Sequence, residues 1–345
     1  MNKESSGGMT AGAVYVQTNE PDNHVLGFTR AADGALTPAG STATGGKGDG
    51  VAHLTSQGSV ILTQDGQHLL VTNAASDDLS VFTVGMSGLS VVDVVATGAQ
   101  PKSVTEHAGL VYVLNTGTPG VTGFRFIDGR LAPIAGSERV LAMNADPAQV
   151  GFSPDGSTLI VTQRGTDSIT SFAVGMDGLL GEPQSHPSSG PTPYGFAFAS
   201  DGTLVVTEAF RAEKGAAAAS TYSVASGSVT PISTSVGNGR SEICWAVVSK
   251  DDRHVFTTNF ADGAVSRYGI DLDGFLSLED AVAGTAVEGV TGLRDEDLTV
   301  DGRFLYAIDA DGGWIYGWSV GDAGELSAIG SWEGIPASVA GLAAS

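Results

Sequence analysis

The sequence is poor in cysteine, in cations and in long apolar runs. Its one cysteine, Cys244, excludes an intrachain disulfide and a cysteine-based zinc cluster. The 16 lysines and arginines are outnumbered by 38 acidic residues, and a net charge of −22 repels nucleic acid phosphates and anionic membranes. No apolar run approaches the ~20 residues that span a bilayer, and no apolar secretion signal is visible. These absences disfavour a nucleic-acid-binding, membrane-embedded or disulfide-stapled protein.

The cations are also scattered along the chain without a basic cluster, so an anionic substrate is not expected. We expect a small-molecule substrate, no bound cofactor and no metal. A cytoplasmic monomer is consistent with these features. We expect residues 1–12 to be a disordered lead-in and residues 13–345 to form a single domain.

What the sequence does contain is one pattern repeated seven times. The clearest copy, residues 147–172, reads as a strand, an SPDG turn, a second strand with a polar end, and a third strand. The polar strand ends recur every 42 to 54 residues, at Asn19, Asn73, Asn115, Gln163, Glu208, Asn259 and Asp309. Seven such units, each of about four short strands, predict an all-β fold, the seven-bladed β-propeller.

The last ten residues predict how this ring closes. Residues 336–345 resemble the first strand of a blade with nothing after it, and the N-terminal blade lacks its innermost strand. Pairing the two would join the chain ends and cover an open sheet edge.

A site is expected at one mouth of the central channel, where first strands begin and second strands end. The candidates from first strands are Gln57, Gln149, Tyr194 and Trp245, and those near the ends of second strands are Asn73, Asn115, Gln163, Arg164, Glu208, Asn259 and Asp309. Polar residues at strand ends commonly bond the backbone of the next turn, so most of this second set is expected to be structural.

Glu208 differs from the other strand ends because they are mostly amides. A carboxylate in a partly dry mouth has a raised pKa and can act as a general base, with Gln149 stabilising a developing oxyanion. A purely structural Glu208 is the alternative.

Two other chemistries are weaker candidates. A nucleophilic Cys244 needs a nearby histidine, and none of the six histidines occupies a predicted mouth position, although His53 lies in a segment that could reach it. The acidic run Asp295, Glu296 and Asp297 suits calcium or magnesium, but strand alternation turns Glu296 away from its neighbours. A solvated acidic loop is the preferred interpretation of that run.

The segment PAQVGFSPDG at 147–156, with VTE at 206–208 and CW at 244–245, resembles the seven-bladed propeller lactonase family over residues 13–344. That family includes 6-phosphogluconolactonase and fungal carboxy-muconate cyclase. The segments PYGFAF at 193–198 and GLAA at 341–344 resemble an actinobacterial-type branch of it.

The resemblance implies a lactone-opening hydrolase, but one motif departs from it. The phosphogluconolactonase branch typically carries Pro-Arg-His where this chain has Pro147, Ala148 and Gln149, so both the phosphate-binding cation and the proton-moving histidine are absent. The expected substrate is therefore a neutral lactone or ester. The alternative is a non-catalytic propeller that binds a peptide or small molecule over the channel mouth.

Overall fold

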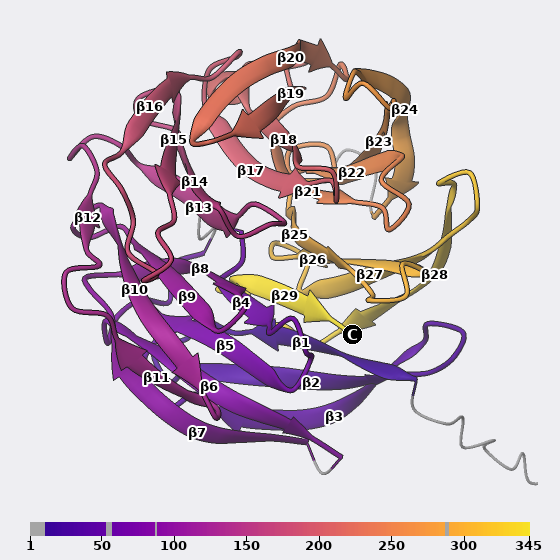
Figure 1. The fold of residues 1–345 in the computed structure, drawn as a ribbon. Coiled ribbons are helices and arrows are strands. Elements are labelled where there is room, and N and C mark those ends of the chain that lie inside the picture. Colours follow the sequence, from indigo (N-terminus) through magenta and orange to yellow (C-terminus); the bar gives the residue numbers. More distant parts are fainter. Residues whose placement is uncertain (1–10, 53–56, 87, 287–289) are drawn as a thin grey trace, which may run out of the picture.

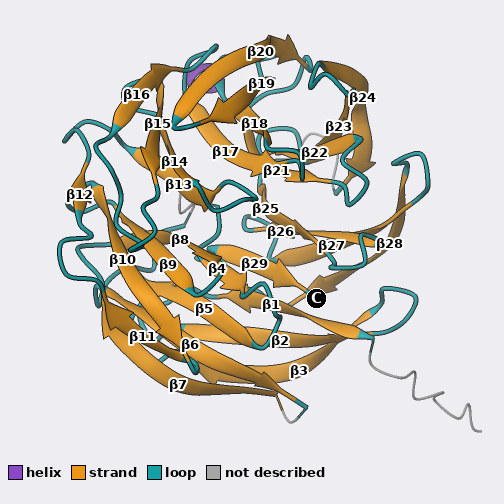
Figure 2. Ribbon diagram, in the orientation of Figure 1, coloured by secondary structure: helices purple, strands orange, loops and turns teal. Residues whose placement is uncertain are grey.

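Seven antiparallel sheets, six of four strands and one of five, form a ring around a central channel in the computed structural model, which describes residues 11–52, 57–86, 88–286 and 290–345 (Figure 1). Nearly all regular structure is strand (Figure 2). The helical structure in the described residues is one turn, η1 (Phe210–Ala212), so this part of the chain has no helix able to cross a membrane. The predicted seven-bladed propeller is confirmed. The predicted lead-in, apart from its last two residues, lies outside the described residues.

The first three blades, from the channel outwards, have these strands. Blade one holds β29 (Gly341–Ala344), β1 (Gly12–Gln17), β2 (His24–Arg30) and β3 (Leu36–Ala43). Blade two holds β4 (Val60–Leu62), β5 (His68–Asn73), β6 (Asp78–Gly85) and β7 (Gly88–Ala96). Blade three holds β8 (Pro101–His107), β9 (Leu110–Asn115), β10 (Gly120–Ile127) and β11 (Arg130–Pro133), with the short β12 (Arg139–Val140) also paired to β10.

The other four blades repeat the order. Blade four holds β13 (Pro147–Phe152), β14 (Thr158–Gln163), β15 (Ser168–Ala173) and β16 (Gln184–Pro187); blade five holds β17 (Pro193–Phe198), β18 (Thr203–Glu208), β19 (Ala218–Ala225) and β20 (Ser228–Gly237). Blade six holds β21 (Ile243–Val248), β22 (His254–Asn259), β23 (Ala264–Ile270) and β24 (Leu276–Thr285); blade seven holds β25 (Leu293–Leu298), β26 (Phe304–Asp309), β27 (Trp314–Val320) and β28 (Leu326–Glu333).

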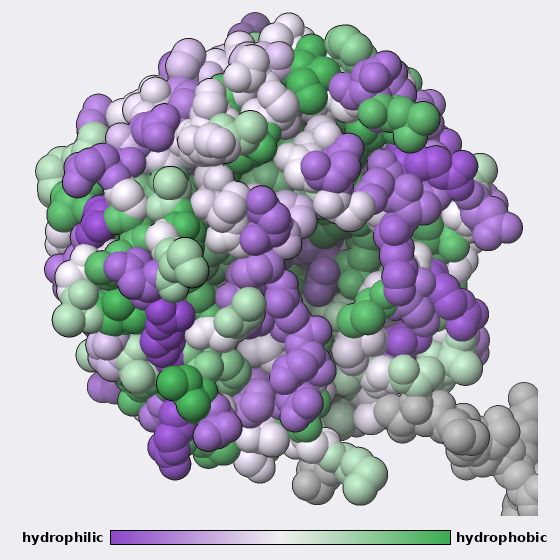
Figure 3. Space-filling view, in the orientation of Figure 1, coloured by the Kyte–Doolittle hydropathy of each residue, from purple (hydrophilic) through white to green (hydrophobic). Residues whose placement is uncertain are grey.

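The core lies between neighbouring blades. All residues of the second strands β9, β14, β18, β22 and β26 are buried, because each of these strands is covered on both faces. Between their first and last residues these strands accordingly contain only apolar side chains and threonines. The outermost strands are largely exposed, and the face of the molecule in Figure 3 is mostly polar and hollowed at its centre.

The ring closes as predicted. Strand β29 pairs antiparallel with β1, from Val14 opposite Ala344 to Gln17 opposite Gly341, and the first and last strands of the chain lie side by side in Figure 1. Four of the ten residues predicted for this segment form the strand. Arg30 adds a tie, because its Nε and a terminal nitrogen donate to the carbonyl oxygen of Ser345 at 3.1 and 2.9 Å.

Candidate functional site

The first strands of blades three to seven share an irregular start that shapes the mouth. In blade five, Pro193 lies opposite Glu208 but Phe196 lies opposite Val206, so the first strand contains one extra residue. Such a bulge turns side chains away from the regular alternation of a strand. The residues at the five bulges are Lys102, Ala148, Tyr194, Cys244 and Arg294.

A residue with left-handed backbone stands two positions before each of these bulge residues. These left-handed residues are Gln100, Asp146, Thr192, Glu242 and Gly292, with φ angles of 55°, 43°, 60°, 54° and 131°. In each of these five blades, the carbonyl oxygen of the left-handed residue accepts a hydrogen bond, 2.9–3.1 Å long, from the amide of the residue that follows the second strand. The same link therefore fixes the start of the first strand and the end of the second, and brings both to one rim.

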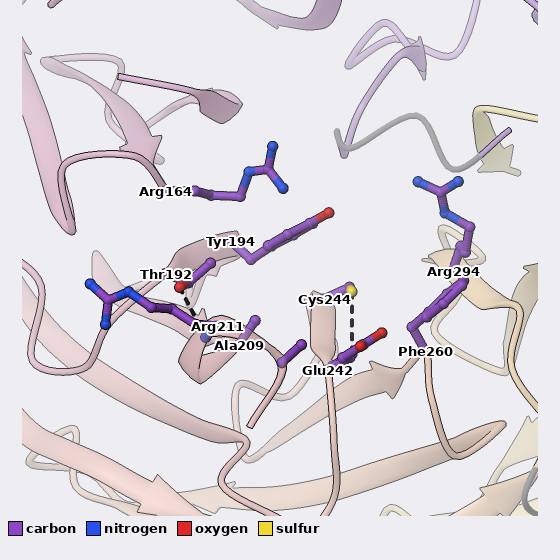
Figure 4. A pocket seen from close by; sticks show the side chains of 10 residues that line it. Arg164, Thr192, Tyr194, Ala209, Arg211, Glu242, Cys244, Phe260 and Arg294 are labelled. Carbon is purple, nitrogen blue, oxygen red and sulfur yellow. Dashed lines mark hydrogen bonds between the residues drawn. The ribbon is translucent and has the colours of Figure 1, made fainter. Parts of the chain in front are cut away.

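A pocket of about 410 Å³ lies at this rim between blades four and seven (Figure 4). Its walls are mostly apolar, and its volume suits a small molecule. It is lined by Arg164, Thr192, Tyr194, Ala209, Arg211, Ala212, Glu242, Cys244, Phe260 and Arg294. Three arginines and one glutamate thus line a single cavity. The expectation that the cations form no cluster is wrong, because arginines from three different blades, far apart in the sequence, line the same pocket.

Two predicted site residues, Arg164 and Tyr194, are brought together in this pocket. The Arg164 guanidinium lies 4.8 Å from the centre of the Tyr194 ring and 2.7 Å from an Asp146 carboxylate oxygen. Figure 4 shows Arg164 on one side of Tyr194, with Cys244 and Glu242 on the other. Burial raises the pKa of Tyr194 well above its usual range, so the phenol is neutral. The aromatic ring and Asp146 together hold Arg164 at the rim.

Cys244 faces the pocket as a protonated thiol. Burial raises its pKa to about 12, and its Sγ lies 3.2 Å from the carbonyl oxygen of Glu242. No histidine is among the described residues that line the pocket, and His53 lies outside the described residues. A thiolate nucleophile is therefore not supported here.

The strand-end residues turn away from this pocket and into the blades. Four of them donate to a hydroxyl of the third strand of their own blade, seven residues later, and Asp309 bonds to the turn that follows it. Asn73 donates to Ser80, Asn115 to Thr122, Gln163 to Thr170 and Asn259 to Ser266, whereas the Asp309 carboxylate accepts from the Gly312 amide. This pattern supports the structural role expected for most of the set.

Glu208 belongs to the same pattern. Its carboxylate is fully buried and accepts from Ser220 Oγ at 2.6 Å, Ser235 Oγ at 2.7 Å and the Tyr222 hydroxyl at 3.5 Å. Burial raises the pKa of Glu208, and these hydroxyl donors partly oppose the rise. Its neighbour Ala209 lines the pocket, whereas Glu208 does not. The catalytic role of Glu208 stays a prediction.

The amides predicted from the first strands bind sheet edges inside the channel. Gln149 makes two hydrogen bonds with the backbone of Phe196, at 2.6 and 3.0 Å, and Gln57 of blade two reaches Ala246 of blade six at 3.0 Å. Both line a second cavity of about 520 Å³ in the channel, apart from the mouth pocket. Trp245 is buried with its ring 4.9 Å from that of Tyr194, so it supports the pocket wall from behind.

The acidic run 295–297 is not the solvated loop that the sequence suggested. It lies within β25, where Asp295 and Glu296 are 2% exposed. Asp297 accepts from the Ala344 amide at 2.8 Å, and Asp295 from the Leu342 amide at 3.4 Å, so both hold the inner edge of the closing strand. Burial raises the pKa of Asp297 to about 7. No group of three potential metal ligands was found among the described residues.

Sequence reasoning missed Glu242, Arg294, Arg211, Thr192 and Phe260. An alignment of the blades on the first residue of each first strand would have found most of them. It pairs Thr192 with Glu242 and Tyr194 with Cys244 and Arg294. Apart from Arg164, the sequence predicts the strand-end residues themselves, whereas the residue one position later, such as Ala209 or Phe260, is the one that lines the pocket.

Comparison with known proteins agrees with this architecture. The family profile described as "Lactonase, 7-bladed beta-propeller" matches residues 10–135, 112–209 and 206–333. Comparison with curated proteins gives no match.

Several solved structures share the fold. A protein of Lactobacillus plantarum has a TM-score of 0.76 at 16% identity, over 97% of this chain and 99% of its own. A Bacteroides uniformis protein provisionally named a 6-phosphogluconolactonase has a TM-score of 0.74 at 18% identity, over 95% and 98%. The periplasmic gluconolactonase of Pseudomonas aeruginosa has a TM-score of 0.72 at 18% identity, over 96% and 98%. At these identities the likeness shows a common fold and leaves the substrate open.

Proposed function

The chain belongs to the seven-bladed β-propeller lactonase family, and we propose that it is a lactonase-like hydrolase whose active site is the mouth pocket. The reaction is the ring-opening of a small lactone or ester by water. The observation that supports it is one cavity in which a carboxylate, Glu242, shares the walls with Arg164 and Arg294. Two structural neighbours, one named a gluconolactonase and one provisionally named a 6-phosphogluconolactonase, are consistent with this class of reaction.

The geometry assigns Glu242 the role of general base. Its backbone is fixed twice, because its carbonyl oxygen accepts from the Phe260 amide at 2.9 Å and from Cys244 Sγ at 3.2 Å. The side chain is left to project into the pocket beside Cys244 (Figure 4). A carboxylate that projects into a cavity can accept a proton from an attacking water.

In the proposed reaction, Glu242 takes a proton as the water oxygen attacks the carbonyl carbon of the lactone. The carbonyl oxygen becomes an oxyanion, which the guanidinium of Arg294 stabilises inside the low-dielectric pocket. The carbon–oxygen bond of the ring then breaks, and the leaving alkoxide takes the proton back from Glu242. The product is an open-chain hydroxy acid, and the enzyme returns to its starting state.

The arginines also revise the expected charge of the substrate. The sequence predicts a neutral lactone, because the Pro-Arg-His motif is absent at 147–149 and the net charge is −22, but three of the 16 cations of the chain line this one pocket. In a protein of net charge −22, such a concentration favours a substrate that carries an acidic group, held by Arg164 as a charge-assisted contact. We therefore propose a lactone bearing a carboxylate or phosphate, bound by a cytoplasmic monomer.

The test compares the two candidate bases. Hydrolysis of glucono-δ-lactone and of 6-phosphogluconolactone is followed by proton release for the wild type, Glu242→Gln and Glu208→Gln, with spontaneous opening subtracted. We expect Glu242→Gln to lower kcat by about a hundredfold or more, since general base catalysis contributes about 10²–10⁴-fold, with an unchanged Tm. Glu208→Gln should change Tm and retain most of the activity.

The reverse result, activity lost in Glu208→Gln with folding intact, would move the site into blade five. The absence of hydrolysis of any lactone by the wild type would favour the other candidate, a non-catalytic propeller. Binding of a small acid to the pocket would then be its remaining activity.

A further inference from the structure

The rim of the mouth pocket contains an unusual backbone segment. Phe210, Arg211 and Ala212 have φ angles of 48°, 52° and 61°, so three consecutive residues with side chains adopt the left-handed region. In that region Cβ lies too close to the following carbonyl oxygen, and glycine is normally required. The segment contains no glycine, so other contacts must hold it in place.

Those contacts come from the neighbouring connection and from blade four. The Phe210 amide donates to the Pro191 carbonyl oxygen at 3.1 Å, and the Arg211 amide donates to Thr192 Oγ1 at 3.1 Å. Asp167 joins the two segments, because one of its carboxylate oxygens accepts from the Thr192 amide at 2.8 Å and the other from the Arg211 guanidinium. The aspartate therefore fixes the rim whether or not Arg211 is bound to it.

Arg211 is the exposed member of this set. Its side chain is 67% exposed, whereas the main chain beneath it is fixed. In Figure 4 the guanidinium points away from Tyr194 and Cys244, towards the outside of the pocket. An exposed ion pair contributes little to stability, so a ligand with a stronger negative charge can replace Asp167 as the partner of the Arg211 guanidinium. Arg211 is also one of the residues that line the pocket, so its side chain starts at the edge of the cavity.

We propose that Arg211 is a specificity-determining residue, which exchanges Asp167 for the acidic group of the substrate when the pocket is filled. The strained turn places the arginine at the rim in advance, and Asp167 keeps it extended until a ligand arrives. This inference rests on the proposed function and adds the rule for choosing substrates: lactones with an acidic group are selected over neutral ones of the same ring.

The experiment measures selectivity, as the ratio of kcat/KM for 6-phosphogluconolactone to kcat/KM for glucono-δ-lactone. In Arg211→Gln we expect this ratio to fall by about ten- to hundredfold, through a higher KM for the acidic lactone. Arg211→Lys should restore part of it. Arg130→Gln is the matched control, because Arg130 is 72% exposed and lies 3.9 Å from Asp93, far along blade three.

Arg211→Gly separates binding from folding. Glycine accepts a φ of 52° without strain, so this variant should melt at the same temperature as the wild type or higher, and still lose the selectivity. An unchanged ratio in both Arg211→Gln and Arg211→Gly, or equal losses for both lactones, would overturn the proposal.

A calorimetric titration keeps the two proposals apart. If the wild type hydrolyses neither lactone, the proposed function fails, but gluconate and 6-phosphogluconate can still be titrated into the wild type and Arg211→Gln. Weaker binding of 6-phosphogluconate to the variant would support the role of Arg211. Equal affinity, or no binding to the wild type, would refute it.

Discussion

At the mouth of the propeller, two adjacent positions of each blade can be compared: the last residue of the second strand and the residue after it. Gln163, Glu208 and Asn259 point into their blades, while Arg164, Ala209 and Phe260 line the pocket. Side chains alternate along an extended chain, so one step separates a buried hydrogen bond from a binding surface. Residue type alone identifies the wrong member in blades five and six, and only in blade four does it include the lining residue, Arg164.

The blade-six pair should show the largest difference. Asn259 is fully buried, and its amide pairs with Asn238, Ser266 and the Ala264 carbonyl. We expect Asn259→Ala to cost about 2–4 kcal/mol, because it leaves several buried groups unsatisfied. Phe260→Ala should cost less and should raise KM for the proposed lactones. Chemical denaturation gives the free energy of unfolding of both variants, and kinetics give their KM. Equal changes of the two quantities in Asn259→Ala and Phe260→Ala would contradict the assignment.

The blade-four pair should give a smaller stability effect and a clearer functional one. Gln163→Ala removes the hydrogen bond to Thr170 and should cost about 1–2 kcal/mol with normal kinetics. Arg164→Gln should change the free energy of unfolding by about 1 kcal/mol or less, since Asp146 is exposed, and raise KM for an acidic lactone about tenfold. A KM effect in Gln163→Ala with none in Arg164→Gln would contradict the assignment.

The pH dependence of Glu208 should be the smallest effect. Its pKa is raised in the folded state by burial, so its contribution to stability is fully present below its unfolded pKa and is lost as the pH rises through the folded pKa. Glu208→Gln should therefore gain stability relative to the wild type as the pH increases from 4 to 8. Thermal melts of both proteins across that range test the direction of this change. If the Tm of the two proteins changed with pH in parallel, the ionisation of Glu208 would not destabilise the folded state.

Much of the fold could be predicted from the sequence, because each blade carries its own local pattern of strands and turns. Six-residue strands of apolar residues and threonines that end in a polar side chain mark the buried second strands, and turns such as SPDG mark the hairpins from first to second strands. The unpaired segment at the end of the chain predicted closure on blade one, and β29 confirms it.

The candidate site could be predicted only in part. Arg164 and Tyr194 were identified, but Glu242 and Arg294 were not, because a bulge and a left-handed residue at the strand start shift the expected alternation. The acids of β25 were assigned to a solvated loop, since charged residues are rarely buried without partners; the backbone amides of β29 supply partners for Asp295 and Asp297.

The sequence by itself therefore determined the number of blades, the buried strands and the way the ring closes. These properties depend on local periodicity and on patterns repeated every 42 to 54 residues. Only the tertiary structure decided which side chains share the pocket. Arg164, Arg211 and Arg294 are 47 and 83 residues apart in the chain, and they meet only because the ring brings the rims of blades four, five and seven around one cavity.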